Sequence, residues 1–256
     1  MARKAAVKPQ VDNVQSGNAP STPRATNNSL KIRIDDLKTF NPLTENQKIF
    51  FDSYKRGDYF TALHGVAGTG KTFCALYKAL EEVLDKSNTF DKIIIVRSAV
   101  QSREIGHLPG DVGEKMEIFQ QPYQQICETL FGRKDAYQRL TEQGYIQFIS
   151  TSFIRGMSFD DAIIIVDEMQ NLNYEEIDTV MTRVGYRSKI IWCGDYRQTD
   201  LRKNNDKSGI LKFFDIAQHM SSFTRIEFTA DDIVRSSLVK EYILAKLRYE
   251  DHVENK

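Results

Sequence analysis

The chain has 256 residues, of which 41% are hydrophobic and 27% charged, which is typical of a globular protein that buries its own core. Its 35 Lys and Arg residues equal its 35 Asp and Glu residues, so no net charge draws the whole chain to nucleic acid or to an anionic membrane. The longest apolar run, Ala162 to Val166, is too short to cross a bilayer, and the N-terminus lacks the apolar segment of a secretory signal. We therefore expect a cytoplasmic protein without a membrane contact.

The three cysteines, Cys74, Cys127 and Cys193, are far apart and form no CxxC pair. This spacing excludes a zinc site and a disulfide framework, and it is typical of buried thiols in a reducing compartment. Residues 1–28 are rich in Pro, Ser, Thr and Asn and contain almost no large apolar side chain, which predicts a flexible tail. We expect a single domain over residues 29–256.

From Leu30 onward, short β-branched runs alternate with segments of helical spacing. The sequence predicts strands at Tyr59–Leu63, Lys92–Val96, Tyr145–Ile149, Ala162–Val166, Ile190–Cys193 and Phe223–Phe228. It predicts helices after Thr44 and at Lys71–Leu84, Gly113–Phe131, Tyr174–Val184, Gly209–His219 and Ala230–Tyr249. Near-continuous apolar strands separated by helices indicate a three-layer α/β fold, in which helices cover both faces of a mostly parallel sheet.

A phosphate-binding loop follows the first predicted strand and opens the next helix. The loop consists of Gly65, Val66, Ala67, Gly68, Thr69, Gly70, Lys71 and Thr72, and it matches the P-loop pattern in full. Backbone N–H groups of such a loop and the N-terminus of its helix attract an anion. We expect Lys71 to bridge the β- and γ-phosphates of ATP, and the Thr72 hydroxyl to complete the shell of Mg²⁺.

Two further strands end in polar side chains that suit hydrolysis. Asp167 and Glu168 follow a buried strand directly, at the end of the sheet where ligands bind in α/β folds. We expect Asp167 to hold Mg²⁺ and Glu168 to act as general base toward the attacking water. The strand over Ile190–Cys193 leads to Gln198, whose amide we expect to contact the γ-phosphate or that water.

Together these residues resemble the PhoH-like family of P-loop ATPases, which is related to the superfamily 1 helicase core. The resemblance extends from about Asn41 to Leu247 and implies a RecA-like P-loop fold. Besides the P-loop, it rests on the sequences RSAV at 97–100, GHLPGD at 106–111, FIRG at 153–156, VDEMQN at 166–171, GDYRQTDL at 194–201 and DIVRS at 232–236. Ser98, Met169 and Ser236 stand where the family usually has Pro, Ala and His.

The resemblance implies one core domain, and no segment after Leu247 is long enough for a second. It therefore implies that a neighbouring subunit lends a cation to the site, in a homo-oligomeric ring such as a hexamer. We expect Arg235 to be this cation, outside its own phosphate cradle and at the head of the last helix. The alternative is a surface ion pair of Arg235 with Asp231 or Asp232.

Gln47 has two compatible interpretations. In helicase-like proteins a Gln ahead of the P-loop reads adenine through its amide, and the resemblance implies this role for Gln47. From the residues alone, Thr44 is the N-cap of a helix that carries Ile49, Phe50 and Tyr54.

The leading hypothesis is a helicase-like ATPase that depends on single-stranded RNA or DNA. Its candidate contacts to the strand are Arg97, Arg103, His107, Lys115 and Arg155. A small-molecule phosphotransferase is one rival, which the general base Glu168 disfavours. A nucleotide-gated protein that remodels a protein partner is the other, and stimulation of ATP turnover by single strands separates the hypotheses.

Overall fold

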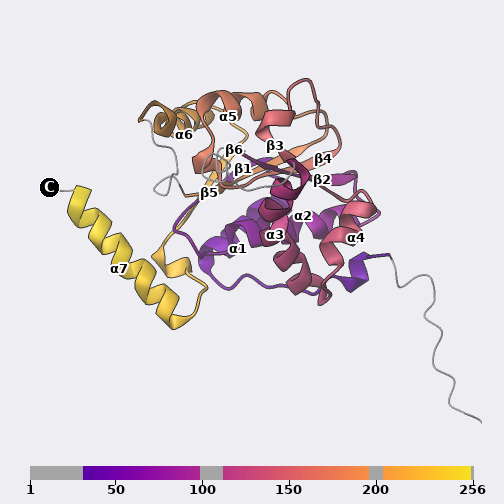
Figure 1. Ribbon diagram of the computed structural model, residues 1–256, viewed down its shortest axis with the longest axis horizontal. Coiled ribbons are helices and arrows are strands. Elements are labelled where there is room, and N and C mark those ends of the chain that lie inside the picture. Colours follow the sequence, from indigo (N-terminus) through magenta and orange to yellow (C-terminus); the bar gives the residue numbers. More distant parts are fainter. Residues whose placement is uncertain (1–30, 99–111, 196–203, 255–256) are drawn as a thin grey trace, which may run out of the picture. The chain divides into compact units, whose positions relative to one another are not determined.

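A six-stranded parallel sheet forms the middle layer of the fold (Figure 1). The computed structural model describes residues 31–98, 112–195 and 204–254, so the predicted tail at 1–28 lies outside the described residues. The strands are β1 (Phe60–Gly65), β2 (Lys92–Arg97), β3 (Ile146–Ser150), β4 (Ala162–Val166), β5 (Lys189–Gly194) and β6 (Phe223–Phe228). Their spatial order is β3-β2-β4-β5-β1-β6, and every pair is parallel. All six predicted strands and the α/β fold class are confirmed.

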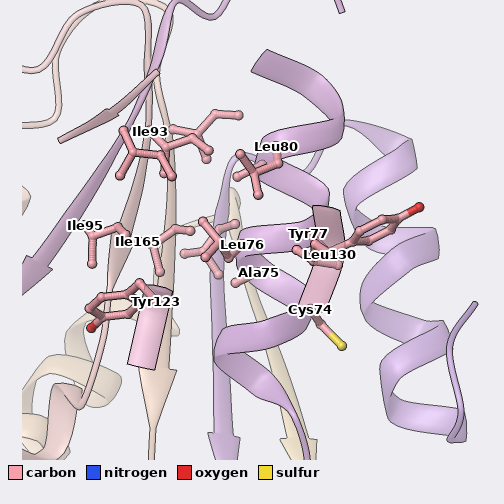
Figure 2. Packing of buried hydrophobic residues seen from close by; sticks show 14 of the residues in the cluster. Cys74, Ala75, Leu76, Tyr77, Leu80, Ile93, Ile95, Tyr123, Leu130 and Ile165 are labelled. Carbon is pink, nitrogen blue, oxygen red and sulfur yellow. The ribbon is translucent and has the colours of Figure 1, made fainter. Parts of the chain in front are cut away.

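Helices cover both faces of this sheet. One face packs against α1 (Glu45–Arg56), α2 (Lys71–Leu84), α3 (Val112–Phe131) and α4 (Ala136–Glu142), and the other against α5 (Tyr174–Met181) and α6 (Asn204–Ala217). Successive side chains of a strand point to opposite faces of the sheet, so the core forms two clusters. Ile93 and Ile95 face the first group of helices, whereas Ile94 and Val96 face the second. Figure 2 shows part of the first cluster, including Leu76 and Leu80 of α2.

Three helices differ most from the sequence prediction. The helix α4 was not expected, because its seven residues offer only Ala136, Tyr137 and Leu140 to the core. The helix α6 begins at Asn204 instead of Gly209. The last helix, α7 (Ser237–Glu254), begins seven residues later than predicted, because Ala230–Asp232 form a 3-10 turn, η6. The Asp232 carboxylate accepts a hydrogen bond from the Thr229 N–H at 2.8 Å and closes this turn.

A buried ion pair joins β5 to α2 at the amino end of the sheet. The Lys189 ammonium lies 2.8 Å from both carboxylate oxygens of Glu82, and both side chains are largely buried. The Tyr54 hydroxyl also donates to Glu82, and the Lys189 ammonium lies 4.2 Å from the centre of the Tyr54 ring.

Within the described residues, no helix is both long and apolar enough to cross a bilayer.

Candidate nucleotide and magnesium site

The P-loop connects β1 to α2 at the carboxyl end of the sheet. Gly65 has φ of 112°, and a Cβ at this position would overlap the Phe228 carbonyl of the neighbouring β6. That carbonyl instead accepts a hydrogen bond from the Val66 N–H at 2.9 Å, so the loop turns where only glycine fits. The Lys71 ammonium donates to the Gly65 and Val66 carbonyls at 2.8 and 2.7 Å. Burial lowers the pKa of Lys71, and the nearby Asp195 opposes this shift most strongly among the groups around it.

Thr72 and Asp167 bring the two sequence motifs together. The Thr72 hydroxyl donates to Asp167 Oδ1 at 2.7 Å, across 95 residues of sequence. A hydroxyl beside a buried carboxylate at a P-loop is a set of oxygen donors that Mg²⁺ accepts, with phosphate and water as the remaining ligands. The residues present therefore fit a magnesium ion, which Thr72 and Asp167 would hold.

A buried tyrosine that the sequence analysis missed contacts the other oxygen of this carboxylate. The Tyr123 hydroxyl, from α3, donates to Asp167 Oδ2 at 2.8 Å. Burial raises the pKa of Tyr123 well above its ordinary value, and the negative charge of Asp167 adds to the shift. Tyr123 therefore remains a hydrogen-bond donor, and both oxygens of Asp167 have partners within the described residues.

Glu168 is held in an unusual backbone conformation beside this pair. Its φ of 52° is in the left-handed region, which costs energy in a residue with a Cβ and is common at functional sites. Gln170 donates its amide to Glu168 Oε2 at 2.5 Å, and its own oxygen accepts from the Asp195 N–H at 3.0 Å. Burial, followed by the adjacent Asp167, raises the pKa of Glu168, while Arg97 opposes the shift. A raised pKa makes this carboxylate a stronger base, which suits a group that accepts a proton from water.

Through its hydrogen bonds with Glu168 and Asp195, Gln170 links the segments that follow β4 and β5. A Cβ at Gly194 would overlap the Gln170 side chain, so the absence of a side chain at the end of β5 makes room for the link. Both residues lie within motifs that carry the family resemblance, but a role of Gln170 in the site was not predicted. Gln198 lies outside the described residues, and its expected contact stays a prediction.

Arg97 lies between Glu168 and α3. Its guanidinium is 3.9 Å from Glu168 Oε1 and 5.6 Å from the centre of the Phe119 ring. Its side chain is mostly buried, so it offers little surface to a nucleic-acid strand. Of the other four cations considered for that role, Arg155 is exposed, whereas Arg103, His107 and the side chain of Lys115 lie outside the described residues.

Gln47 lies next to the P-loop and is almost fully buried. Its amide donates to the Thr69 carbonyl at 2.9 Å and accepts from the Leu43 N–H at 2.8 Å. The Thr44 side chain accepts from the Gln47 N–H, so Thr44 is the N-cap of α1 as predicted. Gln47 thus fixes the P-loop to the start of α1. An amide has a second hydrogen and a second lone pair, and a role toward adenine stays a prediction.

Arg235 lies against the P-loop of its own chain. A Cβ at Gly68 would be 3.0 Å from Arg235 Cγ and 3.5 Å from its Nε. The preceding residue, Val234, donates its N–H to the Gly68 carbonyl at 3.0 Å. The expected position outside its own cradle and at the head of the last helix is therefore corrected, because η6 and an extended segment bring Arg235 back over the loop before α7 begins. Asp232, one of its expected ion-pair partners, is buried; desolvation opposes its ionisation, but hydrogen bonds from Thr44, Asn46 and Thr229 outweigh this effect and lower its pKa.

One cavity of about 630 Å³ unites most of these groups. Its walls include Gln47, Ala67, Gly68, Gly70, Lys71, Thr72, Asp167, Glu168 and Arg235. On the side of α3, Pro122, Gln125 and Ile126 close it. Arg97 and Asp195 also line it. The cavity thus presents one ammonium, two guanidinium groups, three carboxylates and a glycine-rich backbone to a common space, which suits a polyphosphate with a divalent cation.

A family model described as PhoH-like protein matches residues 39–246. The chain belongs to the PhoH-like protein family. A PhoH-like protein of Mycobacterium leprae is 35% identical over 229 residues, which cover 88% of this chain and 63% of the relative. A PhoH-like protein of Bacillus subtilis is 35% identical over 209 residues, covering 81% and 64%. Protein PhoH of Escherichia coli is 31% identical over 183 residues, covering 71% and 51%.

This PhoH-like chain spans about three fifths of the length of the first two relatives and about half of the third. Among solved structures, unliganded Pif1 from Bacteroides sp. overlaps with 75% of this chain and 42% of its own, at 13% identity and a TM-score of 0.36. An overlap of this extent is too limited to carry a structural argument. The strand order and the P-loop themselves define the fold.

Proposed function

We propose that this PhoH-like chain hydrolyses ATP with Mg²⁺ in the cavity at the P-loop. The observation that carries the proposal is the 2.7 Å hydrogen bond between Thr72 and Asp167, which joins the two motifs that a magnesium-nucleotide site needs. Lys71 would bind the phosphates, Glu168 would take the proton of the attacking water, and Arg235 would stabilise charge on the transferred phosphoryl group. Magnesium, when bound, would neutralise charge on the phosphate oxygens.

We also propose that single-stranded nucleic acid is the partner, in a helicase-like role. Phe153 is 59% exposed and lies two residues from the exposed Arg155, in the turn that follows β3. The Glu176 carboxylate accepts hydrogen bonds from Thr151 at 2.6 Å and from Ser98 at 3.0 Å, which fixes the start of this turn to α5. An exposed aromatic ring beside a cation, on a fixed turn, suits base stacking and phosphate contact.

Assembly into a ring of identical subunits, such as a hexamer, completes the proposal. None of the described side chains of α7 is fully buried, and Leu238, Val239, Tyr242 and Tyr249 are exposed. Apolar surface of this kind is common where a protein contacts a partner. Light scattering after size-exclusion chromatography, with and without nucleotide, measures the number of subunits.

The test of the main proposal is the rate of ATP turnover with no nucleic acid, with single-stranded RNA and with single-stranded DNA. We expect turnover that requires Lys71 and rises with one of the two strands. Phe153→Ala should reduce this stimulation, whereas Tyr186→Ala, which removes an exposed aromatic ring at the opposite end of the sheet, should leave it intact.

Each other outcome has a defined meaning. Turnover that neither strand stimulates would favour the nucleotide-gated protein that remodels a protein partner. Absence of any Lys71-dependent turnover or ATP binding would refute the assignment of the site.

A further inference from the structure

Two side chains of α3 support the two carboxylates that follow β4, Asp167 and Glu168. Tyr123 donates to Asp167 Oδ2 at 2.8 Å, while the opposite oxygen accepts from Thr72 at 2.7 Å. The Asp167 carboxylate is therefore hydrogen-bonded from two sides, by α2, which follows the P-loop, and by α3. A carboxylate with one oxygen fixed can no longer rotate freely, so its second oxygen keeps its direction toward Thr72.

One turn before Tyr123, the same helix supports the other carboxylate. The centre of the Phe119 ring lies 5.6 Å from the Arg97 guanidinium, whose Nη2 lies 3.9 Å from Glu168 Oε1. Residues four apart on a helix lie on one face, so Phe119 and Tyr123 point to the site together. A guanidinium beside an aromatic ring gains cation–π attraction, and it loses freedom to leave the carboxylate.

The tyrosine ring is anchored in the core. Tyr123 is fully buried in the cluster that contains Ile95 and Ile165, and Figure 2 shows its ring beside these two strand residues. Its ring centre also lies 5.9 Å from that of Phe148. Because these side chains surround the ring, packing holds the hydroxyl at Asp167 in addition to the hydrogen bond.

We propose that the Phe119–Tyr123 face of α3 is a positioning element for the magnesium-nucleotide site. Tyr123 fixes the rotation of Asp167 toward Mg²⁺, and Phe119 holds Arg97 beside Glu168. The inference rests on the proposed function, since it assigns roles toward the metal and the water that this function requires. Partners of metal ligands commonly change metal affinity by about 10- to 100-fold when they are removed.

The test uses Mn²⁺ as a spectroscopic probe of the Mg²⁺ site, in the presence of ADP, with the affinity measured by electron paramagnetic resonance. Tyr123→Phe keeps the buried ring and removes only the hydroxyl. We expect it to weaken Mn²⁺ binding by about 10-fold or more. The affinity for ADP in EDTA should stay within about twofold, because Tyr123 acts through Asp167 and not on the phosphates.

The matched control is Tyr137→Phe. Tyr137 is also a buried tyrosine of the same cluster, and its hydroxyl donates to Gln120 Oε1 at 3.0 Å, away from the site. This variant loses an equivalent hydroxyl and should bind Mn²⁺ as the wild type does. In Phe119→Leu, turnover should fall while the Mn²⁺ affinity stays unchanged, because Phe119 acts on Glu168 through Arg97.

Thermal unfolding shows that each variant is folded before its affinity is compared. Equal Mn²⁺ affinities in wild type and Tyr123→Phe would overturn the role of Tyr123, and equal losses in Tyr123→Phe and Tyr137→Phe would reduce it to general packing. A loss of Mn²⁺ affinity in Phe119→Leu would overturn the division of roles. In each of these cases the proposed site itself still holds if the wild type binds ADP and Mn²⁺. A wild type that binds neither would refute the proposed function as well.

Discussion

Glu168→Gln separates a catalytic role of this residue from a structural one. The substitution keeps the size of the side chain and an oxygen that accepts from Gln170, whose amide lies 2.5 Å from Glu168 Oε2. It removes the carboxylate that directly follows Asp167 and that we propose as the general base. The two roles therefore predict opposite results for turnover and for stability.

The expected loss of turnover is about 10²- to 10⁴-fold, the contribution of a general base, which corresponds to about 3–5 kcal/mol of activation free energy. Stability, unlike turnover, should not fall in this variant. Burial and Asp167 raise the pKa of Glu168 from its ordinary value of 4.5. A raised pKa means that the folded state binds this proton more tightly than the unfolded state does. The contribution of Glu168 to stability is then largest below pH 4.5 and is lost as the pH rises through the folded pKa.

At neutral pH the ionised Glu168 thus lowers the free energy of unfolding, and glutamine removes this cost. In EDTA, urea unfolding of Glu168→Gln should have a midpoint equal to or above that of the wild type at neutral pH, and the advantage should disappear near pH 4. Single-turnover hydrolysis and trapping of bound ATP measure the catalytic loss. Near-normal turnover, or a variant that is less stable at neutral pH and binds no ATP, would refute the reasoning and make Glu168 a structural residue.

Four other experiments test separate parts of the structure. Lys71→Ala should abolish turnover and weaken ATP binding, as measured with a fluorescent nucleotide, and a folded variant with normal turnover would contradict the P-loop assignment. Lys189→Met should lower the free energy of unfolding by about 3 kcal/mol, because it leaves Glu82 buried without its cation, and adding Glu82→Gln should restore part of it. Burial, with Arg225 and Lys71 nearby, lowers the pKa of His64 to about 4, so the unfolded state binds this proton first as the pH falls below 6.5. Stability should fall by about 2 kcal/mol between pH 7 and pH 5, and His64→Gln should flatten this part of the urea-unfolding profile. Mixing inactive Arg235→Ala with inactive Lys71→Ala subunits should restore no ATPase activity, and recovery would show that the arginine acts on a neighbouring subunit.

The strands and the P-loop were predictable because their signals are local. The central strands are short apolar runs such as Ile93–Val96, a pattern typical of strands that are buried on both faces. The late start of α7 was not predictable from periodicity. It depends on the hydrogen bond between Thr229 and Asp232, and on Asp232 accepting from Asn46, which is 186 residues away in sequence. Long-range contacts of this kind leave no trace in a local window.

The same distinction divides the residues of the site. Thr72 and Asp167 were predicted to meet because both follow parallel strands, whose carboxyl ends lie at one edge. Tyr123 was missed because its position depends on how α3 packs on the sheet, and a tyrosine on an apolar helix face resembles any core residue. Gln170 was missed although it lies within the quoted motif, since only the approach of Gly194 shows that its amide spans two strands.

Arg235 shows how topology changes the argument about a shared site. The sequence led us to expect that Arg235 lies outside its own phosphate cradle and serves the site of a neighbouring subunit. The structure has β6 beside β1, and the Phe228 carbonyl at the end of β6 accepts from Val66 of the P-loop. The chain that leaves β6 must therefore pass over its own loop, where Val234 bonds to Gly68 and the side chain of Arg235 follows. An arginine of the same chain thus lies beside the P-loop, and a neighbouring subunit is not needed to bring a cation to this cavity.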